Sequence, residues 1–187
     1  RIYTHKDGKP FLCVFRKGKI MNFEEILNNK DFLNAYYEKY PKVFKNISFP
    51  RFTWDQCFEI LDEDVKNKNP HGQKYLVDGW RSYNAVRIPE VKEIIDILSK
   101  KFNKYFNPDG SQADVAMIYG SWSTHKKAYG PEHIDPENVI FLQVKGRSRW
   151  TVYKDDGSVF LSQELDENDM IYCPGGMKHY VESLTPR

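Results

Sequence analysis

The chain has 187 residues, the size of one domain, and 40% of them are hydrophobic, which is enough apolar surface for a substantial core. Basic and acidic residues nearly cancel to a net charge of +2, so the composition indicates neither a nucleic-acid partner nor a membrane surface. No apolar run approaches the roughly 18 residues that a transmembrane helix needs, and we expect no membrane segment or leader.

Three cysteines, Cys13, Cys57 and Cys173, lie far apart in the sequence. Neither their number nor their spacing is typical of a disulfide framework or a zinc knuckle, which favours a reducing, intracellular compartment such as the cytoplasm. The chain begins at Arg1 rather than Met and stops soon after its last histidine motif, so we expect elements to be missing at both ends.

The first 112 residues are expected to be largely helical. A short apolar run over residues 10–16 predicts an edge strand. Apolar side chains three and four positions apart then predict a helix over residues 22–40, which Pro41 ends.

Two more helices are expected in this region. The segment Thr53–Gln56 has the form of a capping box and predicts a short helix through Leu61, followed by a loop over residues 62–73. Pro89 suits a first helical position, and the apolar stripe after it predicts a helix over residues 89–105.

From residue 113 onward the sequence consists of short β-rich runs separated by turn signals. Closely spaced strands without helices between them predict an antiparallel sandwich or barrel. We therefore expect a mainly β chain in which a helical N-terminal region, residues 1–112, packs on a β-barrel, residues 113–187. The predicted strands are residues 115–119, 139–144, 149–153, 159–161, 170–173 and 180–181.

His133, Asp135 and His179 are the candidate metal ligands. Alternating side chains of a strand point to opposite faces, so His133 and Asp135 share a face with their Cα atoms roughly 6.6 Å apart. His179, which follows the tight bend Pro174-Gly175-Gly176, would add a second imidazole from a neighbouring strand. Two nitrogens and one oxygen on one face suit non-haem Fe(II) and leave positions for a cosubstrate and O₂.

The competing interpretation is a structural His/Asp pair, because H-x-D triplets also occur by chance. Among the other histidines, His5 and His71 are expected to be structural or solvent-exposed. His125 lies in a polar loop, residues 121–130, where solvent exposure is favoured over contact with a substrate.

Two segments carry a family resemblance: HIDPENVIFLQVKGRSRW, from His133 to Trp150, and LDENDMIYCPGGMKH, from Leu165 to His179. Together they resemble the cupin-type JmjC 2-oxoglutarate oxygenases, and most closely the branch of ribosomal oxygenases and of the asparaginyl hydroxylase that acts on hypoxia-inducible factor. The resemblance covers residues 113–187, whereas the preceding residues share only a helical character with the family.

This resemblance implies a double-stranded β-helix (cupin or jelly-roll) core with His133, Asp135 and His179 as ligands of Fe(II). It also implies 2-oxoglutarate as cosubstrate, O₂ as the oxidant, and a hydroxylase or dioxygenase activity that releases succinate and CO₂. Members of the family hydroxylate protein side chains, and some demethylate N-methylated lysine. For this chain, the sequence leaves open whether the substrate is a protein or a small molecule.

The chain departs from the family pattern at the cosubstrate site. Ser148 stands fifteen positions after His133, where this branch usually has a basic residue for the distal carboxylate of 2-oxoglutarate. Val139 stands where an asparagine is common, although Asn138 is adjacent. A dianion in a partly buried pocket needs a counter-charge.

Arg187, eight residues after His179, is the favoured source of this counter-charge, because a guanidinium grips a carboxylate with two hydrogen bonds. Ser148, with Tyr119 or Thr124, is expected to add hydroxyl hydrogen bonds. Arg147 and Arg149 are weaker candidates, since strand alternation places both opposite Ser148, and Lys145 is better explained as a solvated turn residue.

Two other functions remain open on the sequence alone. Ser148 at the anchor position favours a cupin module that binds a metal without turnover. A cupin enzyme that uses O₂ without 2-oxoglutarate, or another metal, is the further alternative.

Overall fold

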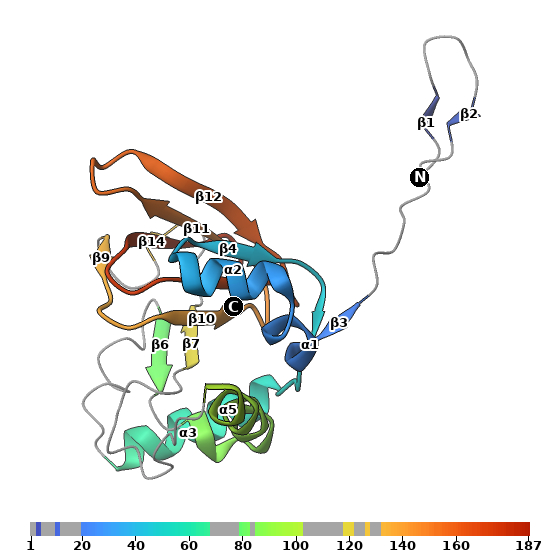
Figure 1. The fold of residues 1–187 in the computed structure, drawn as a ribbon. Coiled ribbons are helices and arrows are strands. Elements are labelled where there is room, and N and C mark those ends of the chain that lie inside the picture. The colour runs from blue at the N-terminus through green and yellow to red at the C-terminus, as the bar shows by residue number, and fades with distance from the viewer. Residues whose placement is uncertain are drawn as a thin grey trace.

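The computed structural model describes residues 3–4, 10–11, 20–67, 79–82, 85–102, 118–121, 126–127 and 132–187. Two antiparallel sheets dominate this part of the chain, which confirms the prediction of a mainly β fold (Figure 1). The first sheet has the order β10 (Val139–Leu142), β13 (Met170–Cys173) and β4 (Lys42–Phe44). The second has the order β12 (Val159–Leu165), β11 (Ser148–Tyr153), β14 (Lys178–Ser183) and β8 (Lys126–Lys127), and β9 (His133–Ile134) also pairs with β14.

The predicted strands all have counterparts, with corrected bounds. β12 runs to Leu165 rather than to residue 161, because it pairs with β11 along its whole length, up to Leu165 opposite Ser148. β14 is likewise six residues long rather than two, since it pairs with β11 on one side and with β8 and β9 on the other. The strand predicted at 115–119 is β7 (Ile118–Ser121), whose described part begins at Ile118.

The N-terminal region contributes a strand that the sequence did not predict. β4 pairs antiparallel with β13, with Val43 opposite Ile171, so it forms an edge of the three-stranded sheet. A short parallel pair, β3 (Met21–Asn22) and β5 (Ile47–Ser48), lies nearby in the sequence. The Ile47 N–H also donates to the Asn168 carbonyl at 2.7 Å, which ties this region to the loop before β13.

The helix predicted over residues 22–40 is two helices, α1 (Phe23–Leu27) and α2 (Lys30–Glu38), so that prediction was wrong about continuity. Asn29 causes the break, because its side chain accepts a hydrogen bond from the Asp31 N–H and so caps the start of α2. α2 ends at Glu38, its C-cap Lys39 has a left-handed φ of 59°, and Pro41 follows.

The capping box at Thr53 and Gln56 is confirmed and opens α3 (Trp54–Lys66). This helix continues to Lys66 instead of ending near Leu61, since Asp64 is buried and accepts a hydrogen bond from Ser82 Oγ in β6 (Gly79–Ser82). The remainder of the predicted loop, from residue 68, lies outside the described residues.

α5 (Pro89–Phe102) begins at Pro89 as predicted and follows a short 3₁₀ helix, η1 (Ala85–Arg87). Its predicted end at residue 105 lies outside the described residues, as does most of the strand predicted at 10–16. Of that strand, β2 (Pro10–Phe11) is described and pairs with β1 (Tyr3–Thr4). No helix among the described residues is long and apolar enough to cross a membrane.

Three apolar clusters hold these elements together. One joins α1 and α2 to the three-stranded sheet, with Phe32 packed edge-on against Tyr172. A second joins α3 and α5 to β6 and β7 around Trp80, and Figure 1 shows these two helices at the end of the molecule away from β12. The third lies between the two sheets and contains Trp150 and Val152 with Ile171.

We expect Gly120→Ala to destabilise the protein, because a Cβ at this position would lie 2.1 Å from Nε1 of the buried Trp80. Overpacking of this kind costs about 1–3 kcal/mol of unfolding free energy. Denaturant unfolding of the variant and of the wild type measures the difference. Ser162→Ala, on the exposed side of β12, should stay within about 0.5 kcal/mol of the wild type. Equal stability of Gly120→Ala and wild type would contradict the packing described for Trp80.

Candidate metal centre

Pairing between β9 and β14 brings the two histidines of the candidate site together. His133 and His179 are directly opposite in this antiparallel pair, and their ring centroids are 4.4 Å apart. Residues in register on neighbouring strands project to the same face of the sheet. The structure therefore places a second histidine on a neighbouring strand, as the sequence predicted.

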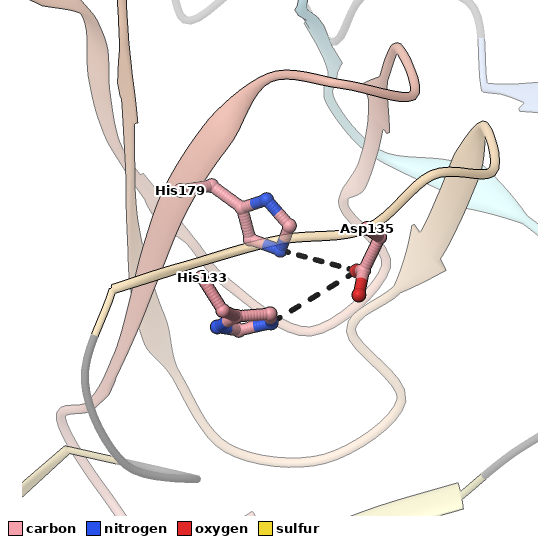
Figure 2. A group of neighbouring side chains, drawn as sticks. All are labelled: His133, Asp135 and His179. Atoms are coloured by element: carbon pink, nitrogen blue, oxygen red, sulfur yellow. Dashed lines mark ion pairs between the residues drawn. The ribbon is translucent and has the colours of Figure 1, made fainter.

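Asp135 completes the cluster, although not through strand alternation. β9 ends at Ile134, and Asp135 lies between the strand and a bend at residues 136–137. Its Oδ2 is 3.4 Å from His179 Nε2 and 3.9 Å from His133 Nε2. Figure 2 shows both imidazoles directed toward this carboxylate. The ligand atoms of the three residues all lie within 4.8 Å of one another, which is close enough for them to share one ion.

His179 is the buried member of this cluster. Its side chain is 3% exposed, against 44% for His133 and 41% for Asp135, so one side of the cluster faces the interior and the other faces outward. Burial lowers the pKa of His179, and the nearby His133 adds to this effect, so the neutral imidazole that a metal requires is favoured. The ring also stacks on Trp150, with centroids 5.3 Å apart and an interplanar angle of 14°.

A backbone carbonyl orients the His179 ring. Nδ1 lies 3.0 Å from the Met177 oxygen, and a carbonyl can only accept, so Nδ1 carries the proton. The lone pair of Nε2 is then directed toward Asp135 and His133. Such a contact from the second ring nitrogen is typical of histidines that bind metals.

The Pro174-Gly175-Gly176 turn packs against the segment that follows Asp135. The Gly176 N–H donates to the Asp135 carbonyl at 2.8 Å, and a Cβ on Gly175 would lie 2.3 Å from the Pro136 oxygen. Gly176 has a φ of +84°, a left-handed conformation that favours glycine. The glycines of this motif therefore allow the loops carrying Asp135 and His179 to approach closely.

Asn138 is a brace between these loops. Its Oδ1 accepts hydrogen bonds from the Gly175 N–H at 3.1 Å and from the Tyr172 hydroxyl at 3.2 Å. The sequence predicted Asn138 as a cosubstrate residue, and nothing in its position tests that. Its observed contacts hold the turn before His179 onto the chain just after Asp135.

Arg187 lies in the interior, as the predicted counter-charge requires. The residue is 5% exposed, its Nε donates to Ser183 Oγ at 3.0 Å, and its guanidinium lies 5.6 Å from the centre of the Phe141 ring. Its backbone N–H and carbonyl both pair with Ser121 at the end of β7. Arg187 and Asp135 line one cavity of about 450 Å³.

The other predicted cosubstrate residues differ in position. Ser148 is fully buried, and its hydroxyl donates to Gln143 Oε1 at 2.6 Å. Tyr119 is half-buried and lines the same cavity as Arg187. Thr124 lies outside the described residues.

Arg147 and Arg149 are on the outer face of β11, as strand alternation predicted. Arg147 forms ion pairs with Glu164 and Asp166, and Arg149 pairs with Glu164 and with Glu182. Both guanidiniums therefore form their ion pairs on the face of β11 that points away from the metal cluster. The histidines that were expected to be structural or exposed, His5, His71 and His125, lie outside the described residues.

Sequence reasoning missed two supporting groups. Ser183 accepts the hydrogen bond from Arg187, and the Met177 carbonyl accepts the one from His179. Met177 lies two residues before His179, and in a tight turn a backbone carbonyl can accept a hydrogen bond from the side chain two residues later. This spacing was therefore a weak signal for the contact. Nothing in the sequence singles out Ser183.

Comparison with known proteins agrees with this geometry. Residues 98–186 match the sequence model of the JmjC domain, and no curated protein sequence matches the chain. The matched segment spans just under half of the chain, and it supports the cupin-type fold with the double-stranded β-helix that the sequence motifs implied. The predicted fold class is confirmed.

Solved structures of YcfD, a ribosomal oxygenase from Escherichia coli, are similar in fold. The complex with cobalt and succinic acid matches with a TM-score of 0.52 at 21% identity, over 83% of this chain and 48% of that chain. The complex with cobalt and 2-oxoglutarate matches with a TM-score of 0.50 at 22% identity, over the same shares. The chain spans about half the length of these structures, and at this identity the similarity concerns the fold alone.

We expect Asn138→Ala to weaken metal binding, because it removes the acceptor that holds Gly175 and Tyr172. Loss of an outer contact of this kind typically costs about tenfold or more in metal affinity. Titration with Co²⁺, followed by its visible absorption, measures the change. Asn138→Asp keeps an acceptor oxygen and should bind Co²⁺ nearly as the wild type does. Wild-type affinity in Asn138→Ala would show that the brace does not support the site.

Proposed function

We propose that this protein is an Fe(II)- and 2-oxoglutarate-dependent oxygenase that hydroxylates a C–H bond of a protein side chain or a small molecule, with release of succinate and CO₂. The observation that carries the proposal is the cluster of His133, Asp135 and His179, whose ligand atoms lie within 4.8 Å of one another. Two imidazoles and one carboxylate are the donor set of the facial triad that binds non-haem Fe(II). The JmjC domain match supports the same class.

These three residues would hold the iron. When bound, Fe(II) together with 2-oxoglutarate supplies the activation of O₂ and the oxidation of the substrate C–H bond. The chain supplies the arrangement of ligands: the Met177 carbonyl fixes the tautomer of His179, and burial keeps its imidazole neutral. His133 and Asp135 are partly exposed, so the site is accessible from the side opposite His179.

Arg187 would bind the distal carboxylate of 2-oxoglutarate. The residue opposite Ser148 in β14 is Ser183, and Ser183 accepts the hydrogen bond from Arg187 Nε. The guanidinium thus lies beside position 148, where the related oxygenases usually have a basic side chain. In this chain the positive charge reaches that place from a different segment.

Other polar side chains near Arg187 are candidates for further contacts with 2-oxoglutarate. Ser148 is committed to Gln143, whose Nε2 donates in turn to the Lys145 carbonyl at 2.6 Å, so this pair is satisfied without a ligand. Tyr119 lines the cavity with Arg187 and is the better placed hydroxyl for the cosubstrate. Thr124 and Asn138 keep their proposed roles as cosubstrate contacts, as the sequence motifs suggest.

Two substrate classes suit this proposal. The ribosomal oxygenase similarity makes a protein side chain the first candidate. A small molecule is the second, because the cavity that Asp135 and Arg187 line has a volume of about 450 Å³ and otherwise mostly apolar walls, among them Trp54, Trp80 and Ile95.

Ser148 supports a competing function. A buried serine whose hydroxyl is already bonded to Gln143 supplies no charge to a dianion. If Arg187 does not replace the missing cation, the protein would be a cupin-type module that binds a metal without turnover, or an enzyme that does not use 2-oxoglutarate.

Succinate formation tests the proposed activity. With Fe(II), ascorbate and 2-oxoglutarate, the wild type is expected to release succinate slowly even without a substrate. Asp135→Ala removes one of three ligands and should abolish this release along with Fe(II) binding. Asp155→Ala, an exposed carboxylate in the turn between β11 and β12, is the control and should keep both. Metal binding by the wild type without succinate, and without calorimetric binding of 2-oxoglutarate, would favour the competing module.

The role of Arg187 is tested separately. Arg187→Met is expected to raise the KM for 2-oxoglutarate about 10- to 100-fold, since hydrogen bonds to charged groups contribute about 1.5–3 kcal/mol. Binding of Co²⁺ should not change, because Arg187 touches none of the three ligands in the structure as described. Arg147→Met, on the outer face, should leave the KM unaltered. An unchanged KM in Arg187→Met would assign the carboxylate to another cation.

A further inference from the structure

Trp150 lies between the two ends of the proposed cosubstrate site. In the antiparallel pairing of β11 with β14, Val152 is opposite His179, and Ser148 is opposite Ser183. Trp150 occupies the intervening inward position of β11, between the level of the metal ligand and the level of Ser183. A molecule that reaches from one level to the other must pass this side chain.

The contacts of the Trp150 ring place it along that path. The indole is 3% exposed and stacks on His179 at one side, with ring centroids 5.3 Å apart. Its centroid also lies 5.1 Å from that of Phe141, and the Arg187 guanidinium lies over the Phe141 ring at 5.6 Å. The Trp150 and Phe141 rings therefore form a chain of contacts that connects His179 to Arg187.

The indole N–H has no acceptor among the residues that the structure describes. Buried Trp N–H groups normally have a partner, because an unpaired donor in an apolar interior is costly. Ser148, at the next inward position, donates its hydroxyl to Gln143 and does not accept from the indole N–H. A buried donor without a partner, placed by strand register between the level of His179 and that of Ser183, indicates a ligand oxygen as its partner.

We infer that the indole N–H of Trp150 donates a hydrogen bond to an oxygen of the bound 2-oxoglutarate. The inference rests on the proposed function and adds a residue to it. Trp150 would then bind the cosubstrate between its two anchors, the metal at one end and Arg187 at the other. The stacking on His179 keeps the indole plane fixed, so the donor is oriented before the ligand arrives.

The test replaces Trp150 with β-(3-benzothienyl)alanine, in which sulfur takes the place of the N–H and the ring shape is retained. Binding of Mn²⁺ is measured first, and binding of 2-oxoglutarate to the Mn²⁺-loaded protein is then measured by calorimetry without O₂. We expect unchanged Mn²⁺ affinity and roughly 10- to 100-fold weaker binding of 2-oxoglutarate, the loss typical of a hydrogen bond to a charged acceptor.

Two outcomes overturn the inference while leaving the proposed function intact. Unchanged affinity for 2-oxoglutarate means that the N–H is not used. Equal loss of Mn²⁺ and 2-oxoglutarate affinity means that Trp150 acts only by positioning the His179 ring. If the wild-type protein binds Mn²⁺ but not 2-oxoglutarate, the proposed function fails, and this inference fails with it.

Trp150→Phe provides a second measurement with ordinary side chains. Phenylalanine lacks the donor but retains an aromatic face toward His179. The variant should again bind 2-oxoglutarate about tenfold or more weakly while binding Mn²⁺ as the wild type does. Higher thermal stability of the metal-free variant, combined with unchanged 2-oxoglutarate binding, would contradict the inference. The N–H would then be an unpaired buried donor that only destabilises the fold.

Discussion

The candidate metal centre depends on the register between β9 and β14. β9 has only two residues, and a slip of one position would turn His133 to the outer face and bring Ile134 inward, since side chains alternate along a strand. Two backbone pairs are a weak constraint on register. The close approach of Gly175 to Pro136, and the Asn138 hydrogen bond to the Gly175 N–H, supply the constraint that the short strand lacks.

The same contacts explain which parts of the site the sequence could predict. His133, Asp135 and the turn before His179 are local motifs, and their combination in a β-rich context predicted that the three side chains converge. The reason given for Asp135 was incomplete, because it lies beyond the end of β9 and is placed by the bend at 136–137 and by the Gly176 hydrogen bond. A motif can thus identify ligands while the geometry that orients them depends on a second loop.

In the rest of the fold, long-range contacts limited what the sequence could predict. β4 is three residues long and becomes a strand only through its pairing with β13, more than 120 residues later, so no local pattern could have revealed it. The extension of α3 to Lys66 also depends on a distant contact, the buried Asp64–Ser82 hydrogen bond. The break at Asn29 has a local cause, because its side chain caps the start of α2 and outweighs the apolar periodicity. Apolar periodicity correctly located the helices and misjudged their ends.

The proposed role of Arg187 also offers a physical explanation for the serine at position 148. Position 148 holds a serine that is satisfied by Gln143, while Arg187 bonds to Ser183, the residue opposite 148 in β14. Two small hydroxyl side chains in register leave room for a guanidinium that enters from another segment. A lysine or arginine at 148 would compete for that space and place two cations side by side, at an electrostatic cost in a low-dielectric interior. If Arg187 binds the cosubstrate as proposed, the serine at 148 accommodates that arginine and does not mark the loss of an anchor.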